Sequence, residues 1–331
     1  VGNPNIQNTI IDGYNLENPQ SVILINSPPG NPCIMPEIFG FTITDGSGTI
    51  VLIDNGDGST IEQNMGGGIF VNNALPIINY NFIKDCNCGE QECSIQSGGA
   101  IQQSTGANFP TFIDIEVAEH RCEGDLDYSN NMFYNNGADY GSSFDSDGFT
   151  GYIDMTNSYF DVYAEEQQDV SEYWVDFDDN LENISLEGGE GFKDAISQDI
   201  WVSVNGSYDN SGLTEDEAFP TIYYAMQNIY ATENNPVNIY LTEGVFGPGY
   251  SGGHWSTIKM LSNINLIGQG PSSTILNYSQ TIGSVIRLMD TTNNLISNLT
   301  ITGGSGSFGN YYGGGIYIAR SNPTLSFLHI K

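Results

Sequence analysis

Short runs of alternating apolar and polar residues fill most of this 331-residue chain. The apolar positions are mainly Ile, Val, Phe and Tyr, and Gly, Asn, Asp and Ser separate the runs every ten residues or so, at roughly the spacing of short strands joined by turns. Alternation with a period of two predicts strands with one buried side. In residues 78–82 we expect Ile78, Tyr80 and Phe82 to point inward together. The spacing leaves no room for strand–helix–strand crossovers, which favours a sandwich, a barrel or a parallel solenoid.

One long segment of this pattern occurs twice. Residues 66–84 return as residues 313–331 at a constant offset (313 − 66 = 247), and a weaker copy begins at residue 98. Recurrence of a glycine corner, a strand, a turn and a second strand in the same order favours stacked coils over a sandwich. The repeated glycines fit corners that need positive φ or close packing between coils. They are Gly66, Gly67, Gly68, Gly98, Gly99, Gly313, Gly314 and Gly315.

The pattern divides the chain into tandem units. Residues 1–180 are interpreted as the C-terminal coils of one unit, with Tyr173–Val175 as its last strand. Residues 181–198 are interpreted as an acidic, Gly-rich linker, and residues 199–331 as the N-terminal cap and first coils of a second unit. Both ends of the sequence fall within a unit. We therefore expect a segment of a longer tandem-unit polypeptide, or a subunit covered by neighbours in a filament.

One short helix is predicted near residues 220–231. Pro220 suits its first position, because the ring fixes φ and the missing N–H needs no partner there. Its apolar face has the helical spacing i, i+3, i+4, i+7 and consists of Ile222, Ala225, Met226 and Ile229. A helix of this kind can cover the open end of a solenoid.

The second unit opens with a strand that is followed by the turn Gly206-Ser207, the short helix and the strand 237–241. It continues with residues 264–268 and 299–304. This order resembles secreted right-handed parallel β-helix proteins of the pectin-lyase-like class. The Gly-Gly copies, together with residues 133–136, are similar to the paired short motifs of polymorphic outer-membrane proteins, which are surface adhesins. The resemblance implies an all-β, right-handed parallel β-helix solenoid, a fold that hosts both enzymes and inert stalks.

The charge balance makes some classes of binding partner unfavourable. Forty acidic residues stand against seven Lys and Arg, a formal net charge of −33. Such a surface repels phosphate backbones and anionic lipids, so we expect no nucleic-acid partner. It suits a secreted protein in salty or calcium-rich water, although it would equally keep a large surface soluble. No apolar run reaches the roughly 18 residues of a membrane span. The expected location is extracellular or at the cell surface.

The five cysteines are Cys33, Cys86, Cys88, Cys93 and Cys122. Three of them lie in one short loop, and their spacing matches neither zinc nor iron–sulfur sites. We expect a disulfide within this loop, formed in an oxidising compartment. The odd count leaves at least one thiol free or paired elsewhere.

Clustered carboxylates in turns are the candidate metal ligands. Oxygen-rich turns of this kind suit calcium, the only cofactor expected; a solvated turn is the competing interpretation, and catalysis by a carboxylate pair is a third. The candidate calcium ligands are Asp145, Asp147, Asp176, Asp178, Asp179, Asp54 and Asp57.

No catalytic residue is predicted. Polysaccharide lyases of the resembled class use Arg or Lys as base and uronate clamp, whereas the seven basic residues here are scattered. Lys84 and Lys331 occupy equivalent positions of the repeat, which indicates repeat structure. His120, His254 and His329 are isolated in sequence. Nineteen tyrosines and three tryptophans could form platforms for glycans or protein partners, or simply cover coil faces.

These patterns favour an extracellular structural or adhesive repeat protein that forms a stalk, fibre or filament without catalysis. Its expected partners are further copies of itself, head to tail or as filament neighbours, and glycans or other surface proteins. The alternative is a secreted carbohydrate-active enzyme of the parallel β-helix class, either a polysaccharide lyase or a glycoside hydrolase.

Overall fold

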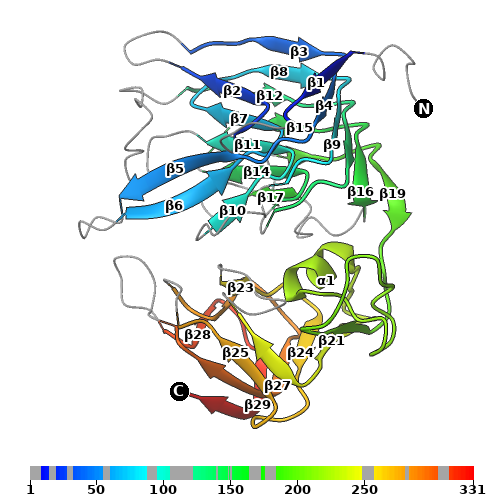
Figure 1. The fold of residues 1–331 in the computed structure, drawn as a ribbon, viewed down its shortest axis with the longest axis vertical. Helices are drawn as coiled ribbons and strands as arrows, with labels where there is room; N and C mark the ends of the chain where they lie inside the picture. The colour runs from blue at the N-terminus through cyan, green and yellow to red at the C-terminus, as the bar shows by residue number, and fades with distance from the viewer. Residues whose placement is uncertain are drawn as a thin grey trace. The chain divides into compact units, whose positions relative to one another are not determined.

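The computed structural model describes residues 9–14, 20–27, 33–54, 60–87, 95–104, 122–138, 141–147, 149, 151–163, 173–175, 184–247, 257–279, 283–304 and 313–331. The chain divides into two compact units, Val1–Asp194 (unit 1) and Ala195–Lys331 (unit 2). In both units strands from successive turns of the chain pair in parallel, and one short helix is present among the described residues (Figure 1). The fold is therefore an all-β parallel β-helix solenoid, as predicted.

Unit 1 has three parallel sheets. Sheet A contains β1 (Ile10–Asp12), β4 (Thr42–Thr44), β9 (Phe82–Lys84), β13 (Met132–Tyr134), β16 (Tyr159–Tyr163) and β19 (Glu190–Asp194). Sheet B contains β2 (Ile23–Asn26), β7 (Ile69–Asn72), β11 (Ile101–Ser104), β14 (Phe144–Asp147) and β17 (Tyr173–Val175). Sheet C contains β3 (Glu37–Phe39), β8 (Ile77–Asn79), β12 (Leu126–Asp127), β15 (Ile153–Asp154) and β18 (Ile184–Ser185).

Each coil of unit 1 visits the sheets in the order B, C, A. Coil 1 is β2–β3–β4, coil 2 is β7–β8–β9, coil 3 is β11–β12–β13, coil 4 is β14–β15–β16 and coil 5 is β17–β18–β19. A separate sheet D adds a hairpin of β5 (Thr49–Asp54) and β6 (Thr60–Met65), which pair antiparallel, and β10 (Ile95–Ser97), which is parallel to β6. Strands β5 and β6 therefore form an insertion between coils 1 and 2.

Like residues stack over like in the core, as expected for a solenoid. Along sheet A, Ile43 pairs with Ile83 and Ile83 with Phe133, and the ring of Phe133 stacks on Phe160 at 5.4 Å between centroids. All four side chains are fully buried. The column shows why each coil needs its neighbours: the inward side of a single coil would expose its apolar row to water.

Unit 2 repeats this architecture with two sheets. Sheet E contains β20 (Ile200–Val202), β21 (Val237–Leu241), β22 (Gly244–Phe246), β24 (Ile264–Ile267), β25 (Thr274–Asn277), β27 (Leu295–Thr302) and β29 (Thr324–Ile330). Sheet F contains β23 (Ile258–Lys259), β26 (Ile286–Met289) and β28 (Ile316–Ala319). The helix α1 (Ile222–Asn228) packs beside β20, and its predicted apolar face is buried.

The offset of 247 residues relates structural equivalents. Strand β28 corresponds to β7, and β29 corresponds to β8 and β9 together. Tyr80 and Phe327, which occupy the same position of the repeat, both have left-handed backbones, with φ of 57° and 50°. The repeat therefore specifies corners as well as strands.

The corner at Tyr80 corrects one prediction. Its left-handed backbone turns the chain, so the alternation restarts: Asn81 and Ile83 point inward, whereas Tyr80 and Phe82 do not. Tyr80 is 46% exposed and packs against Phe39 at 5.0 Å, whereas Asn81 is buried. A strict period of two cannot be extended through such a corner.

Two boundaries also differ from expectation. The helix begins at Ile222, because Thr221 is its N-cap and accepts the Tyr224 N–H at 3.0 Å, so Pro220 precedes the helix. Strands β18 and β19 lie within the segment 181–198 that was expected to be a linker, since they pair with β15 and β16 as part of coil 5. The division between the compact units falls after Asp194.

Among the residues that the structure describes, no helix has the length and hydrophobicity needed to cross a membrane.

Candidate functional site

The outer face of sheet B carries polar side chains in register on neighbouring strands. Tyr128 reaches the inner face of this sheet, where its hydroxyl donates to Gln103 Oε1 at 2.7 Å. Because side chains alternate along a strand, Gln102 and Ser104 point to the outer face. Gln102 pairs with Asp145 of β14, and Ser104 pairs with Asn72 of β7. We call Asn72, Gln102, Ser104 and Asp145 the sheet B polar cluster.

The cluster is buried although it lies on the outside of the sheet. Asn72, Gln102 and Ser104 are fully buried and Asp145 is 5% exposed. Asn72 Nδ2 donates to Asn26 Oδ1 at 2.8 Å, and Gln102 Nε2 donates to the Gln103 carbonyl at 3.4 Å.

Within the described part of the chain, three oxygens of the cluster have no hydrogen-bond partner: Asn72 Oδ1, Gln102 Oε1 and Ser104 Oγ. A buried acceptor without a partner costs about 1–3 kcal/mol. Such groups call for an unseen water or ion. Amide, hydroxyl and carboxylate oxygens are ligands of hard cations such as calcium and magnesium. Neighbouring strands lie about 4.8 Å apart, so the side chains that pair across adjacent strands, Asn72 with Ser104 and Gln102 with Asp145, come within reach of one ion. The residue types and the missing partners together fit an oxygen-ligated cation.

Only one of the predicted calcium ligands falls in this cluster, Asp145. Asp147 and Asp54 end strands β14 and β5, and the structure describes their backbone alone. Asp57, Asp176, Asp178 and Asp179 lie outside the described residues. In the described parts of the chain, no three or more His, Cys, Asp or Glu residues gather into a group that could hold a metal. The cluster differs from such a group because three of its four members are neutral.

The three neutral members of the cluster were not predicted from the sequence, because the coils had not been aligned with one another. The sequence carries a signal that would have supplied this alignment: Gly66, Gly98 and Gly141 each have positive φ and each stand three residues before the first residue of a sheet B strand. Aligned on these glycines, Phe70, Gln102 and Asp145 fall in one column, and Asn72 and Ser104 in another.

Other carboxylates on the surface of unit 1 stabilise turns or neighbouring strands. Asp127 accepts from Asn79 Nδ2 at 3.0 Å and from the Ser129 hydroxyl at 2.8 Å. Burial alone would raise the pKa of Asp127, but these hydrogen bonds lower it below its usual value. Asp161 behaves differently: burial raises its pKa, although Lys193 at 3.8 Å opposes this. Asp127 is therefore held in its ionised form by groups that belong to the fold.

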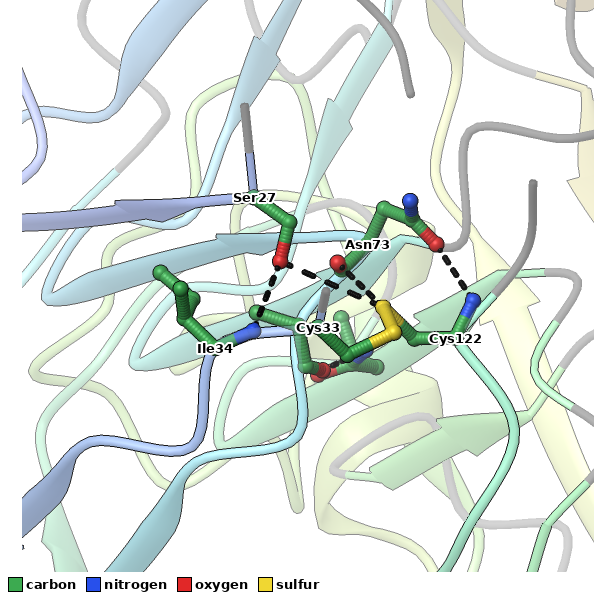
Figure 2. The surroundings of a disulfide bond; sticks show 7 residues. Ser27, Cys33, Ile34, Asn73 and Cys122 are labelled. Atoms are coloured by element: carbon green, nitrogen blue, oxygen red, sulfur yellow. Dashed lines mark hydrogen bonds between the residues drawn. A yellow bond between two sulfur atoms is a disulfide. The ribbon is translucent and has the colours of Figure 1, made fainter. Parts of the chain in front are cut away.

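Cys33 and Cys122 form a disulfide, with Cα atoms 5.7 Å apart (Figure 2). The bond lies at the corner between sheets B and C and bridges the loops of coils 1 and 3. Asn73, from the same corner of coil 2, accepts the Cys122 N–H at 2.7 Å, and Ser27 accepts the Ile34 N–H at 3.1 Å. The disulfide thus joins coils 1 and 3, and the Asn73 hydrogen bond links coil 2 to them.

The other cysteines fall into two groups. Cys86 is a free, buried thiol, so it takes no part in the disulfide expected within the loop 86–93. Cys88 and Cys93 lie outside the described residues, as do His120 and His254. His329 is exposed in β29 at the position equivalent to Phe82.

The glycine corners have two separate physical causes. Gly66 has φ of 61°, a conformation that L-residues rarely adopt. Gly67 packs against the next coil, since a Cβ there would lie within contact distance of the Gly99 carbonyl oxygen. One glycine therefore makes the turn and the next allows close stacking, as the repeat predicted.

Comparison with known proteins finds no matching family model, no matching curated protein and no matching solved structure for this chain.

Proposed function

We propose that this chain is a structural and adhesive repeat protein of the cell exterior, built as a pectin-lyase-like parallel β-helix and stabilised by calcium. The observation that carries the proposal is the sheet B polar cluster: three buried oxygens on β7 and β11 have no hydrogen-bond partner among the described residues, and Asp145 pairs with Gln102 on the next strand, β14. A calcium ion there would be held by Asn72 Oδ1, Gln102 Oε1, Ser104 Oγ and the Asp145 carboxylate. Such an ion would link β7, β11 and β14, and so would fasten three successive coils.

Two further features support an extracellular location. The Cys33–Cys122 disulfide belongs to an oxidising environment. The net charge of −33 is tolerated best where cations screen it. Extended stacks of coils with exposed aromatic side chains, such as Phe39 and Tyr80, offer the surface that an adhesin needs.

The test is thermal unfolding of the whole chain with calcium, with magnesium and with EDTA, together with calcium titration by calorimetry. A ligand at 100 times its Kd stabilises by about 2.7 kcal/mol, so the unfolding temperature is expected to rise measurably in calcium. The variants D145N and Q102L should lose this rise. The control D154N alters a carboxylate on sheet C that accepts the Thr156 N–H, and it should keep the rise.

Equal unfolding temperatures in calcium and EDTA, with no heat of binding, would refute the calcium role. The adhesive role is tested separately by binding of the labelled chain to arrays of glycans. Because net charge disfavours anionic polymers, neutral glycans are the expected ligands.

A secreted carbohydrate-active enzyme is the second candidate. One observation favours it: Asp145 is a buried carboxylate on the strand beside Gln102, and buried carboxylates are often used as acid–base groups. A polysaccharide-degradation screen with the wild-type chain and the D145A variant distinguishes the enzyme from the adhesin. Product formed by the wild type and not by D145A would favour the enzyme over the adhesin.

A further inference from the structure

The part of the chain that the structure describes contains two Asn-Gly pairs, Asn136-Gly137 in unit 1 and Asn205-Gly206 in unit 2. A third pair, Asn55-Gly56, lies outside the described residues. Asparagine is a labile side chain, and a glycine after it leaves the next backbone nitrogen open to approach, because glycine carries no Cβ. The two described pairs share this local chemistry, so a difference in their reactivity comes from the fold.

Asn205 lies in an exposed turn. It is a central residue of the turn that follows β20, and the Gly206 N–H closes this turn with a bond of 2.9 Å to the Ser203 carbonyl. The Asn205 backbone N–H donates to Ser203 Oγ at 3.2 Å, whereas its side chain takes part in no hydrogen bond among the described residues. The carboxamide can therefore rotate toward the backbone nitrogen of Gly206.

Asn136 lies at a corner of coil 3 and is held there by coil 2. Its Oδ1 accepts the Cys86 N–H at 3.1 Å, and its Nδ2 donates to the Ile83 carbonyl at 3.0 Å. The following nitrogen is also fixed, because the Gly137 N–H donates to the Cys86 carbonyl at 2.9 Å. The carboxamide can meet this nitrogen only when the two coils separate locally, which is a rare event in a packed part of a fold.

We propose that Asn205 is a site of spontaneous covalent modification, at which the asparagine becomes a mixture of aspartate and isoaspartate, and that the fold protects Asn136 from the same reaction. The modification needs only water as co-reactant. It depends neither on the calcium site nor on the adhesive role, so it goes beyond the function proposed above.

The reaction has two steps, and no group is oxidised or reduced. In the first, the backbone nitrogen of Gly206 attacks Cγ of Asn205. The N–Cγ bond forms and the Cγ–Nδ2 bond breaks, and the side-chain nitrogen leaves as ammonia with the proton of the Gly206 N–H. In the second, water opens the cyclic imide. Breaking the new N–Cγ bond gives aspartate, and breaking the original peptide bond gives isoaspartate, whose backbone runs through the former side chain.

Isoaspartate at this position would disturb the packing of the turn. Gly206 lies close to the Phe219 carbonyl oxygen, since a Cβ on this glycine would overlap with that atom. The same carbonyl accepts the Ser203 N–H at 2.9 Å. Isoaspartate lengthens the backbone just before Gly206 and displaces it from this contact, whereas aspartate only adds a charge. Because Phe219 lies just before Thr221, the N-cap of α1, the isoaspartate form should loosen the start of the helix.

The test is incubation of the whole folded chain at mildly alkaline pH, where the backbone nitrogen of Gly206 loses its proton more readily. Peptide mapping by mass spectrometry then follows the mass change from amide to acid, and chromatography separates aspartate from isoaspartate peptides. Asn205 is expected to convert at least about tenfold faster than Asn136, which reacts only after local opening. The variant N205Q should lack the fast conversion, because glutamine would have to form a larger ring.

Urea separates the effect of the fold from that of the sequence. In the unfolded chain Asn136 loses its bonds to coil 2, so both asparagines should convert at similar rates. Thermal unfolding shows the consequence of the modification. The incubated wild type should unfold at a lower temperature than the fresh protein, whereas incubated N205Q should not. The variant N205D carries the charge of the product on a normal backbone and should unfold like the fresh wild type.

An unmodified Asn205 after this incubation would overturn the proposal. Equal conversion of Asn205 and Asn136 in the folded protein would also overturn it, because the fold would then protect neither. A difference that persists unchanged in urea would assign the effect to the neighbouring residues in sequence and would contradict protection by coil 2.

Discussion

The side chain of Asn131 in coil 3 holds the backbone of Asn81 in coil 2, because its Oδ1 accepts the Asn81 N–H at 2.9 Å. Its Nδ2 donates to the carbonyls of Ile78 and Tyr128 at 2.5 and 2.8 Å. The pattern continues in both directions: Phe41 N–H donates to Asn81 Oδ1, and Asn131 N–H donates to Ser158 Oγ. Buried polar side chains thus bond successive coils at the corner between sheets C and A.

Replacing Asn131 with Ala should lower the free energy of unfolding by about 2–4 kcal/mol. The change leaves the Asn81 N–H and the Ile78 carbonyl buried without this partner, and each such group costs about 1–3 kcal/mol. Urea unfolding followed by circular dichroism measures the loss. N205A alters an exposed turn residue and serves as the control, with a change expected within about 0.5 kcal/mol. Equal stability of N131A and N205A would show that the hydrogen bonds of the Asn131 side chain contribute nothing to the stability of the fold.

Two glycine substitutions separate packing from backbone strain. In G67A the new Cβ would meet the Gly99 carbonyl oxygen of the next coil, so we expect a loss of more than about 2 kcal/mol. In G40A nothing lies within 4 Å of the Cβ, and only the left-handed φ of 78° is unfavourable, which costs about 1–2 kcal/mol. Thermal unfolding of both variants gives the comparison. G40N should recover most of the loss, because Asn tolerates this conformation, whereas G67N should not.

The repeat made the fold predictable from sequence, since equivalent positions such as Tyr80 and Phe327 had to form equivalent corners. The strand predicted at residues 237–241 coincides with β21. The alternation was misread at Tyr80, because a non-glycine residue at positive φ leaves no mark in a hydrophobic pattern. The polar cluster was not predicted for a different reason. Asn72 is far in sequence from Gln102 and Ser104, and only the stacking of coils brings them together. The disulfide partners, Cys33 and Cys122, likewise meet only through the coil register.

Reducing the Cys33–Cys122 disulfide should destabilise the protein by about 2–5 kcal/mol. The two residues are 89 positions apart, and closing a loop of this length restricts the unfolded chain by an entropy worth about 4–5 kcal/mol. Urea unfolding with and without dithiothreitol measures the difference. The variant C33S/C122S should show the reduced stability in both conditions. A further loss in that variant on adding dithiothreitol would point to a second disulfide.

The thiol of Cys86 should resist alkylation until the protein unfolds. Burial raises its pKa to about 12, and the thiol contacts the carbonyl of Lys84 at 3.4 Å. In the unfolded chain an ordinary thiol has a pKa of about 8.5. The folded state therefore keeps a proton that the unfolded state loses, and this contribution to stability is complete below about pH 8.5 and disappears as the pH rises toward 12. Iodoacetamide labelling in a C88S/C93S background at pH 9, with and without urea, isolates this thiol. C86S should remove the pH-dependent component, and rapid labelling of the folded protein would contradict a buried Cys86.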